Sequence, residues 1–224
     1  MIFWKSYFLR EVKLAYLEGG SCFNGAIQTL LCGILFPLAL SASPVLLLKL
    51  GPGIIWSCAL LGCLIPVDGL FATDLKDGSL DWLACNKTSL SMVAFLKIFA
   101  TWIVRCLPVL IACALLAIFF NYPFENFPKL LLSLGIGSLI FCFIGGMSSA
   151  FIPYGKKGNS LLGLILLPLC MPVIIFGALS CQTIENNPAT AQMAFEMLTG
   201  LLFLTLPLCT LMSGVALKEQ ISQY

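Results

Sequence analysis

Residues 70–83 read LFATDLKDGSLDWL and form the densest run of charge in this sequence. The run lies between two long apolar segments. Ionised aspartate and lysine side chains are costly in hydrocarbon, so the chain must leave the membrane here. Apolar side chains are nevertheless too frequent for an ordinary solvated loop; they are Phe71, Leu75, Leu80, Trp82 and Leu83.

Two short amphipathic helical turns fit this stretch. Thr73 is placed to cap the first turn, Gly78 to end it in a left-handed conformation, and Ser79 to start the second turn. Such turns would lie against the membrane surface and offer an apolar edge to something outside it. The alternative is a membrane-hugging loop that has no partner.

Composition places the chain in a membrane. Its 224 residues are 60% hydrophobic and only 10% charged, and the mean hydropathy is +1.03. A soluble domain carries about 25% charged residues. The net charge of +2 gives no indication of nucleic-acid binding.

The fold class predicted is an all-α integral membrane protein, a single transmembrane domain over residues 1–224. Apolar runs predict six membrane helices at residues 22–42, 52–71, 91–120, 128–152, 160–181 and 193–217. Residues 1–20 predict an interfacial helix, for which a cleaved signal peptide is the alternative. Residues 72–90 form the predicted cytoplasmic segment between the second and third helices.

Prolines mark helix starts and kinks. Pro52 suits the first turn of the second helix, where its missing N–H needs no partner. Further prolines inside predicted spans are expected to kink them; they are Pro66, Pro108, Pro168, Pro172 and Pro207.

Lysine and arginine set the orientation. With the N-terminus inside, one side carries Lys5, Arg10, Lys13, Lys76, Lys87, Lys156, Lys157 and Lys218, and the other only Lys49 and Lys129. This asymmetry predicts that both termini are cytoplasmic.

Three charges fall within predicted spans. Asp68 and Lys97 lie at similar depth on neighbouring helices, so they either pair or reach the interface separately. Arg105 is deeper and is expected to face the bundle interior or another subunit. It could contact an anionic substrate or hydrogen-bond to helix-end carbonyls.

Small residues four apart recur on the fourth predicted helix. The candidate packing residues are Gly137, Gly145, Gly146 and Ser149. Such spacing lets helices approach closely, either within the chain or against a partner subunit.

Enzymatic and metal chemistry find little support. The chain has no histidine, which removes the usual general base and the commonest metal and haem ligand. It has no phosphate-binding loop of the G-x-x-x-x-G-K-[ST] kind. The 11 cysteines include no Cys-x-x-Cys and mostly occupy apolar runs, where cysteine acts as a small hydrophobe. No catalytic or metal residue is predicted.

Several motifs together resemble the CcmB family, the membrane subunit of the ATP-binding-cassette complex for cytochrome c maturation, long called the haem exporter. They are GPGIIW at 51–56, FxxDLxDGSLxxL at 71–83, Lys97, Trp102, LP at 107–108 and LLPL at 166–169. The chain departs from the family pattern in its cysteine richness, in Arg105 and in Asn86-Lys87-Thr88.

The resemblance implies a permease in the bacterial or mitochondrial inner membrane, with no nucleotide site of its own. ATP would be hydrolysed by a cytoplasmic ATPase partner, and haem would be a possible cargo of the complex. Further implied partners are a haem-handling membrane subunit, a small single-span subunit and a periplasmic haem chaperone. The charged stretch would be the coupling helix, with contacts from Asp74, Leu75, Asp77, Gly78, Leu80, Trp82 and Leu83.

Two other functions are alternatives for a chain of this kind. A non-transporting membrane scaffold of the haem-handling complex is the main alternative. An autonomous secondary transporter is disfavoured, because the sequence lacks an inverted repeat and carries few carboxylates at mid-membrane depth.

Overall fold

The structure is a computed structural model that describes residues 2–17, 21–39, 44–67, 69–85, 88–151, 159–181 and 188–222. Within these ranges the chain is helical and has no strand. The long helices are α2 (Ser21–Ala39), α3 (Pro44–Leu64), α6 (Leu90–Thr101), α7 (Leu107–Phe119), α8 (Phe127–Ala150), α9 (Asn159–Ser180) and α10 (Pro188–Ser222). The remaining elements are α1 (Ile2–Leu17), α4 (Ala72–Lys76), α5 (Ser79–Cys85), η1 (Ile65–Val67), η2 (Trp102–Cys106) and η3 (Phe124–Asn126).

Among the described residues, four segments are long and apolar enough to cross a membrane. They are Leu47–Leu64, Leu90–Phe119, Phe124–Ala150 and Ala189–Ile221. Two shorter apolar helices, Phe23–Ala39 and Leu167–Ser180, accompany them. The chain is therefore a multi-pass membrane protein, and a total of six spans stays a prediction.

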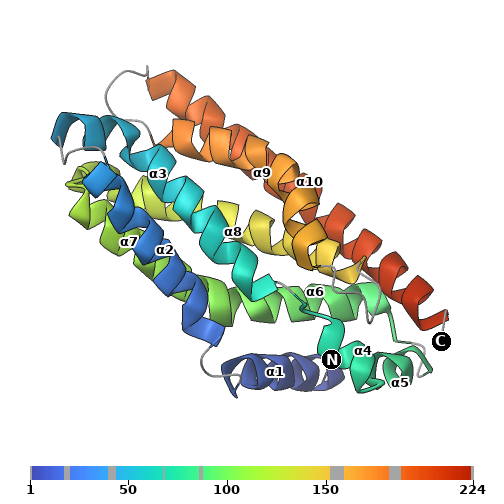
Figure 1. Ribbon diagram of the computed structural model, residues 1–224. Helices are drawn as coiled ribbons and strands as arrows, with labels where there is room; N and C mark the ends of the chain where they lie inside the picture. Colours follow the sequence, from blue (N-terminus) through green and yellow to red (C-terminus); the bar gives the residue numbers. More distant parts are fainter. Residues whose placement is uncertain are drawn as a thin grey trace.

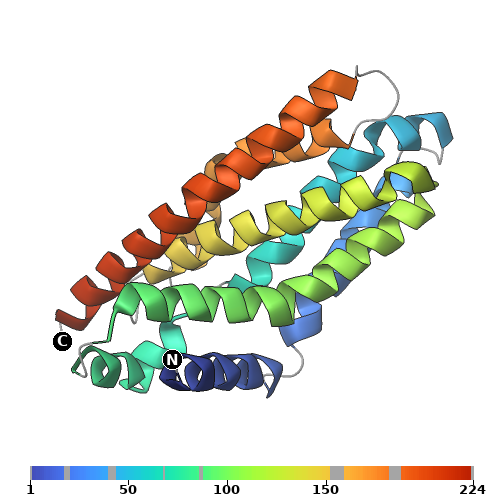
Figure 2. The same ribbon diagram turned by 180° about the vertical axis from the view of Figure 1, so that it is seen from behind.

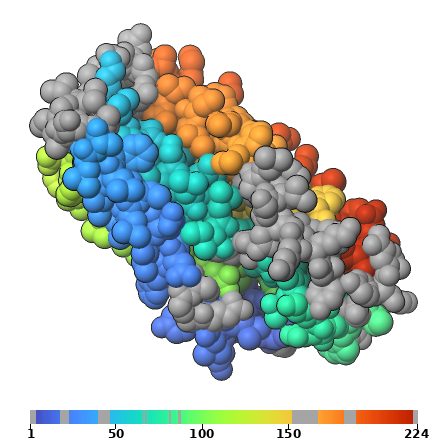
Figure 3. Space-filling view, in the orientation of Figure 1, coloured from blue at the N-terminus to red at the C-terminus, as the bar shows by residue number. Residues whose placement is uncertain are grey.

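Helix α8 lies in the middle of the bundle and packs against α10, α9 and α3. The centre of this packing is Trp56, which is fully buried and meets Phe141 edge to face at 6.2 Å between ring centroids. Figure 3 shows α2, α3 and α9 side by side on one face of the molecule. Large aromatic side chains thus fill the space that small residues leave between the helices.

The second long helix begins earlier than the sequence predicts. It starts at Pro44 and carries Pro52 inside, and its α-helical part ends at Leu64. Pro44 takes the first-turn position that was expected for Pro52. An internal proline is tolerated because, in a membrane, neighbouring helices and local backbone adjustment make up for the lost hydrogen bond.

The third predicted span changes direction partway along. Its segment η2, residues Trp102–Cys106, is a π-helix, and the chain bends between α6 and α7 (Figure 2). Pro108 lacks an N–H, so the carbonyl of Val104 loses its usual helical donor, and the turn before the proline widens. The predicted kink at Pro108 therefore has a structural counterpart.

A separate layer of helices closes one end of the bundle. Helices α1, α4 and α5 lie across this end, and both ends of the chain are drawn there (Figure 1). The end of α2, the start of α3, the end of α9 and the start of α10 lie at the opposite end (Figure 1). At that far end the Tyr122 hydroxyl donates to the Cys181 carbonyl at 2.6 Å and joins the end of α9 to the turn that follows α7.

Candidate functional site

The charged stretch folds as two short helices joined by a tight turn. Helix α4 ends at Lys76, and α5 begins at Ser79. Gly78 between them has φ of 65°, a left-handed conformation that favours glycine. The Ser79 hydroxyl donates to the carbonyl of Asp74 at 3.2 Å. The predicted left-handed conformation of Gly78 and the predicted start of the second turn at Ser79 are confirmed, and the coupling role of Gly78 stays a prediction.

The cap of α4 differs from the prediction. Phe71 occupies the N-cap position and makes no side-chain cap hydrogen bond. Thr73 lies inside the helix, so its predicted capping role is wrong. A fully buried Phe71 anchors this end instead, because burying an aromatic ring stabilises the helix start more than one exposed cap would.

The apolar residues of the stretch divide between two faces. Leu80 and Leu83 are buried within the chain, whereas Trp82 is 64% exposed. Leu75 is half-buried, and Asp77 is exposed. Leu80 and Leu83 were expected to face a partner, but their side chains instead pack α5 against the bundle. The side chain of Asp81 lies outside the described part of the chain.

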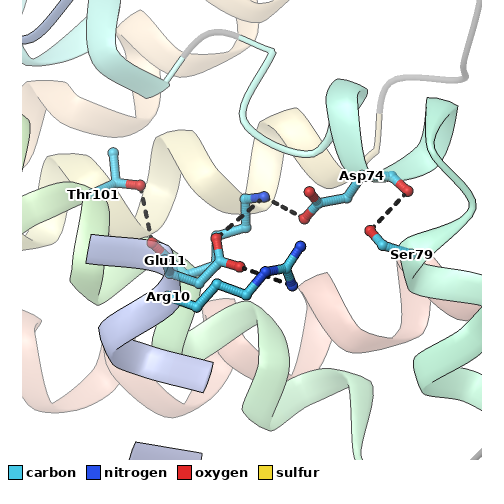
Figure 4. Close-up of polar contacts among 6 residues, drawn as sticks. Arg10, Glu11, Asp74, Ser79 and Thr101 are labelled. Atoms are coloured by element: carbon cyan, nitrogen blue, oxygen red, sulfur yellow. Dashed lines mark hydrogen bonds and ion pairs between the residues drawn. The ribbon is translucent and has the colours of Figure 1, made fainter. Parts of the chain in front are cut away.

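Lys97 is the centre of the site. Its ammonium hydrogen-bonds to the Asp74 carboxylate of α4 and lies 3.6 Å from a Glu11 carboxylate oxygen of α1. Only 10% of the Lys97 side chain and 6% of that of Glu11 are exposed. Figure 4 shows Glu11 and Asp74 approaching from opposite sides. A buried lysine requires such partners, because an unpaired charge in this environment is costly.

One face of helix α1 packs against this centre. Tyr7, Glu11 and Ala15 follow one another at helical spacing and are all buried, where α1 packs on α6. Burial raises the pKa of the Tyr7 hydroxyl above its usual range, and the neighbouring Glu11 carboxylate adds to the shift. Helix α1 is therefore attached through polar as well as apolar groups.

A polar cavity of about 340 Å³ lies beside the cluster. Helix α1 contributes Arg10 and Glu11, the α4–α5 turn contributes Asp77, and η2 contributes Arg105. Arg10 Nη1 lies 3.8 Å from a Glu11 oxygen. The cavity brings both signs of charge together at the end of the bundle.

The predicted intramembrane charges have different outcomes. Lys97 pairs with Glu11 and Asp74, and Arg105 is half-buried on the π-helix and lines the cavity. Asp68 lies outside the described residues, so its pairing with Lys97 is an open prediction. Three residues before Arg105, Trp102 donates its indole N–H to Ser138 at 3.0 Å and ties η2 to α8.

The predicted small packing residues all lie on buried positions of α8; they are Gly137, Gly145, Gly146 and Ser149. A β-carbon at Gly137 would lie 2.3 Å from the Trp56 ring, and one at Gly146 would lie 2.6 Å from Ile98. Both glycines therefore accommodate side chains of this same chain. Packing within the chain accounts for these two positions without a partner subunit.

Sequence reasoning missed Tyr7, Arg10 and Glu11 as parts of the site. The one available signal was Glu11, a carboxylate whose neighbours one helical turn away include Phe8, Leu14 and Ala15. Its partner Lys97 is far along the chain, so spacing could not connect them. Tyr7 gave no signal, because an aromatic residue on an interfacial helix is ordinary.

The chain is similar to known proteins over nearly all of its length. The family model described as CcmB protein matches residues 1–220. Heme exporter protein B of Bradyrhizobium diazoefficiens is 30% identical over 210 residues, which cover 94% of this chain and 95% of the relative. Heme exporter protein B of Rhodobacter capsulatus is 32% identical over 209 residues, which cover 93% of this chain and 95% of the relative. Heme exporter protein B of Escherichia coli K12 is 32% identical over 176 residues, which cover 79% of this chain and 80% of the relative. The chain belongs to the CcmB family.

Proposed function

We propose that this chain is the permease subunit of an ATP-binding-cassette complex for cytochrome c maturation. Its relatives are named heme exporter protein B, and it has the multi-pass architecture that such a subunit needs. In this proposal a cytoplasmic partner hydrolyses ATP. This chain converts the hydrolysis into helix motion that serves haem delivery or release of a haem-loaded periplasmic chaperone.

The bond between Lys97 and Asp74 is the observation that carries the proposal. Helix α4 has only 5 residues, too few to be stable without tertiary contacts. Its carboxylate meets a buried ammonium on α6, and the same ammonium faces Glu11 on α1. A displacement of α4 must therefore move α6 and α1 or separate buried opposite charges. This arrangement suits an element that transmits motion from outside the membrane into the bundle.

The surface offered to the ATPase follows from exposure. Trp82 presents an exposed amphipathic ring on α5, and Asp77 presents an exposed charge at the end of α4. Gly78 sets the angle between α4 and α5, and Leu80 and Leu83 seat α5 from the inside. In the proposal Trp82 and Asp77 make the direct contacts. Asp74 and Leu75, both half-buried, connect these contacts to the bundle.

Orientation and location complete the proposal. Exposed cations on α1 gather at the end of the bundle where both chain ends lie (Figure 1); they are Lys5, Arg10 and Lys13. Positive charge favours the cytoplasmic side, which supports cytoplasmic termini in an inner membrane. The haem-handling membrane subunit, the small single-span subunit and the periplasmic chaperone are proposed partners on the same basis of family membership.

Co-purification tests the proposal. The chain would be isolated from its own membranes, and the bound proteins would be identified and assayed for ATP hydrolysis. A permease subunit should retain an ATPase whose turnover changes when the haem-loaded chaperone is added. An ATPase that co-purifies but ignores the chaperone would favour the membrane scaffold. The absence of any ATPase under conditions that keep other subunits bound would contradict the proposal.

A further inference from the structure

We propose that the outer face of α1 binds the anionic phospholipid headgroups of the adjoining bilayer leaflet. This outer face is formed by Lys5, Leu9, Lys13 and Tyr16, all of which are exposed. None of these residues belongs to the Lys97 cluster or to the ATPase surface proposed on α4 and α5, so the site does not rest on the proposed function. The sequence predicts only that α1 is interfacial, and the structure adds the face that meets the lipid and the charge that this face favours.

The direction of the outer face follows from the packing of α1. The buried side of the helix includes Glu11 and packs on α6. Successive residues of an α-helix are turned by about 100°, so Leu9, two positions before Glu11, lies on the opposite side. Lys5 and Lys13 lie one turn before and one turn after Leu9, and Tyr16 lies two turns after it. These four residues therefore share the side of α1 that is turned away from the bundle.

The outer face is apolar at its centre. Leu9 is 65% exposed and Tyr16 is 74% exposed, whereas the carboxylate-bearing Glu11 is turned inward. A helix face that meets only water is expected to be polar, so this distribution is the reverse of the usual one. Leucine side chains of interfacial helices enter the boundary between headgroups and acyl chains, and tyrosine rings are enriched at the headgroup level. The outer face of α1 therefore suits a bilayer surface better than water.

The charge of the outer face selects the kind of lipid. Lys5 and Lys13 are exposed on either side of Leu9, and the one carboxylate within residues 2–17 is that of the buried Glu11. Lysine stems lie along apolar surface while their ammonium groups reach the phosphates. Basic residues at an interface are attracted to anionic lipids, so phosphatidylglycerol is favoured over zwitterionic phosphatidylcholine.

The position of α1 brings this face to the bilayer surface. Helix α1 ends at Leu17 and α2 begins at Ser21, so the connection between them spans at most about 14 Å. Residues Phe23–Ala39 of α2 form an apolar helix. Helix α1 lies across the end of the bundle in Figure 1 and forms the lower edge of the molecule in Figure 3. Its outer face is therefore within reach of the headgroups beside α2.

Photo-cross-linking in native membranes tests what lies against the outer face. The photoreactive residue p-benzoylphenylalanine would replace Leu9 in one variant and Tyr16 in another, two exposed positions where a large side chain should not disturb the packing. After irradiation of membranes that hold the chain with its partners, mass spectrometry would identify the molecules attached to it. Phospholipid should be the main adduct at both positions. A protein as the main adduct, or no adduct at all, would overturn the proposal, and neither result bears on whether an ATPase co-purifies with the chain.

Nanodiscs test the charge of the lipid. The purified full chain with the cross-linker in place of Leu9 would be placed in nanodiscs that contain equal amounts of phosphatidylglycerol and phosphatidylcholine. Phosphatidylglycerol should be captured preferentially at low salt. The preference should largely disappear at about 1 M salt, where the screening length falls to about 3 Å. Equal capture of the two lipids at low salt would overturn the proposal.

Lysine variants of the same cross-linking chain test which cations select the lipid. Lys5→Gln and Lys13→Gln should each lower the ratio of captured phosphatidylglycerol to phosphatidylcholine about twofold or more, because each removes one charge from the outer face. Lys76→Gln is the matched control, because it removes an exposed cation of α4 at the same end of the bundle, and the ratio should not change. Equal losses in all three variants would show only a general attraction to the basic end of the bundle and would overturn the proposal. Unchanged ratios in the Lys5 and Lys13 variants would overturn it as well.

Discussion

The ammonium of Lys97 lies 3.6 Å from a carboxylate oxygen of Glu11, and both side chains are almost completely buried. This pair joins the first helix of the chain to a helix that begins at Leu90. Asp74 extends the pair to α4. Three elements far apart in sequence thus share one ion cluster at the end of the bundle.

Lys97→Met should destabilise the chain strongly, because it leaves Glu11 and Asp74 close together and without their cation. Removing one partner from a buried ion pair costs about 3–5 kcal/mol. Thermal unfolding in detergent would measure the loss. The triple variant with Glu11→Gln, Asp74→Asn and Lys97→Met should recover most of it. A triple variant as unstable as the single one would contradict the view that the uncompensated carboxylate charges cause the loss.

Gly137→Ala should be costly, whereas Gly135→Ala on the same helix should be tolerated. The new β-carbon at Gly137 would lie 2.3 Å from Trp56, and the one at Gly135 would meet nothing within 4 Å. Overpacking of this kind costs about 1–3 kcal/mol. Unfolding midpoints of the two variants provide the comparison. Equal midpoints would contradict the described packing of α3 on α8.

The sequence predicted the short helices better than their surroundings. The glycine turn at Gly78 follows from local conformational preference, because the left-handed region is strained for residues with a β-carbon. The start of α3 was missed, since proline at an internal helix position is tolerated in membranes, and both Pro44 and Pro52 suit a first turn. The inward direction of Leu80 and Leu83 depends on packing against elements that local pattern cannot identify.

Gly78→Ala should destabilise the α4–α5 turn by about 1 kcal/mol, because φ of 65° is unfavourable for a residue with a β-carbon. Gly78→Asn should cost less, since asparagine tolerates this region better. Gly200→Ala is the matched control, because its β-carbon meets nothing within 4 Å and it lies inside α10. Hydrogen exchange of residues 72–85 would report the change. Faster exchange in the Gly200 variant than in the Gly78 variant would contradict this role.

Tyr7→Phe should reduce the loss of stability that the wild type shows at alkaline pH. The folded-state pKa of Tyr7 is raised by burial, so its stabilising contribution is complete below the ordinary tyrosine pKa of about 10 and is lost as pH rises above it. The unfolding temperature of the wild type should therefore decrease as the pH rises from about 9.5 to 11, and this decrease should be smaller in Tyr7→Phe. At pH 7 the variant should be less stable by about 0.5–1.5 kcal/mol, because its hydrogen bond to Glu11 is lost.

Tyr16→Phe is the control for this pH profile, because the Tyr16 side chain is 74% exposed on the same helix. Its midpoint should follow the wild-type profile. Identical alkaline losses in the wild type and Tyr7→Phe would exclude Tyr7 as the titrating group.

The most direct test of the central claim is the amount of ATPase retained on the purified chain after Trp82→Ala. Trp82 is 64% exposed on α5, and Phe124 is 78% exposed in η3. This segment joins α7 to α8 and lies at the opposite end of the bundle (Figure 1). Phe124→Ala therefore removes a comparable aromatic surface away from the proposed contact. The account predicts that Trp82→Ala loses most of the bound ATPase and that cytochrome c maturation falls with it, while Phe124→Ala retains both. Full ATPase retention and full maturation in the Trp82 variant would contradict the claim that α4 and α5 couple this chain to its partner.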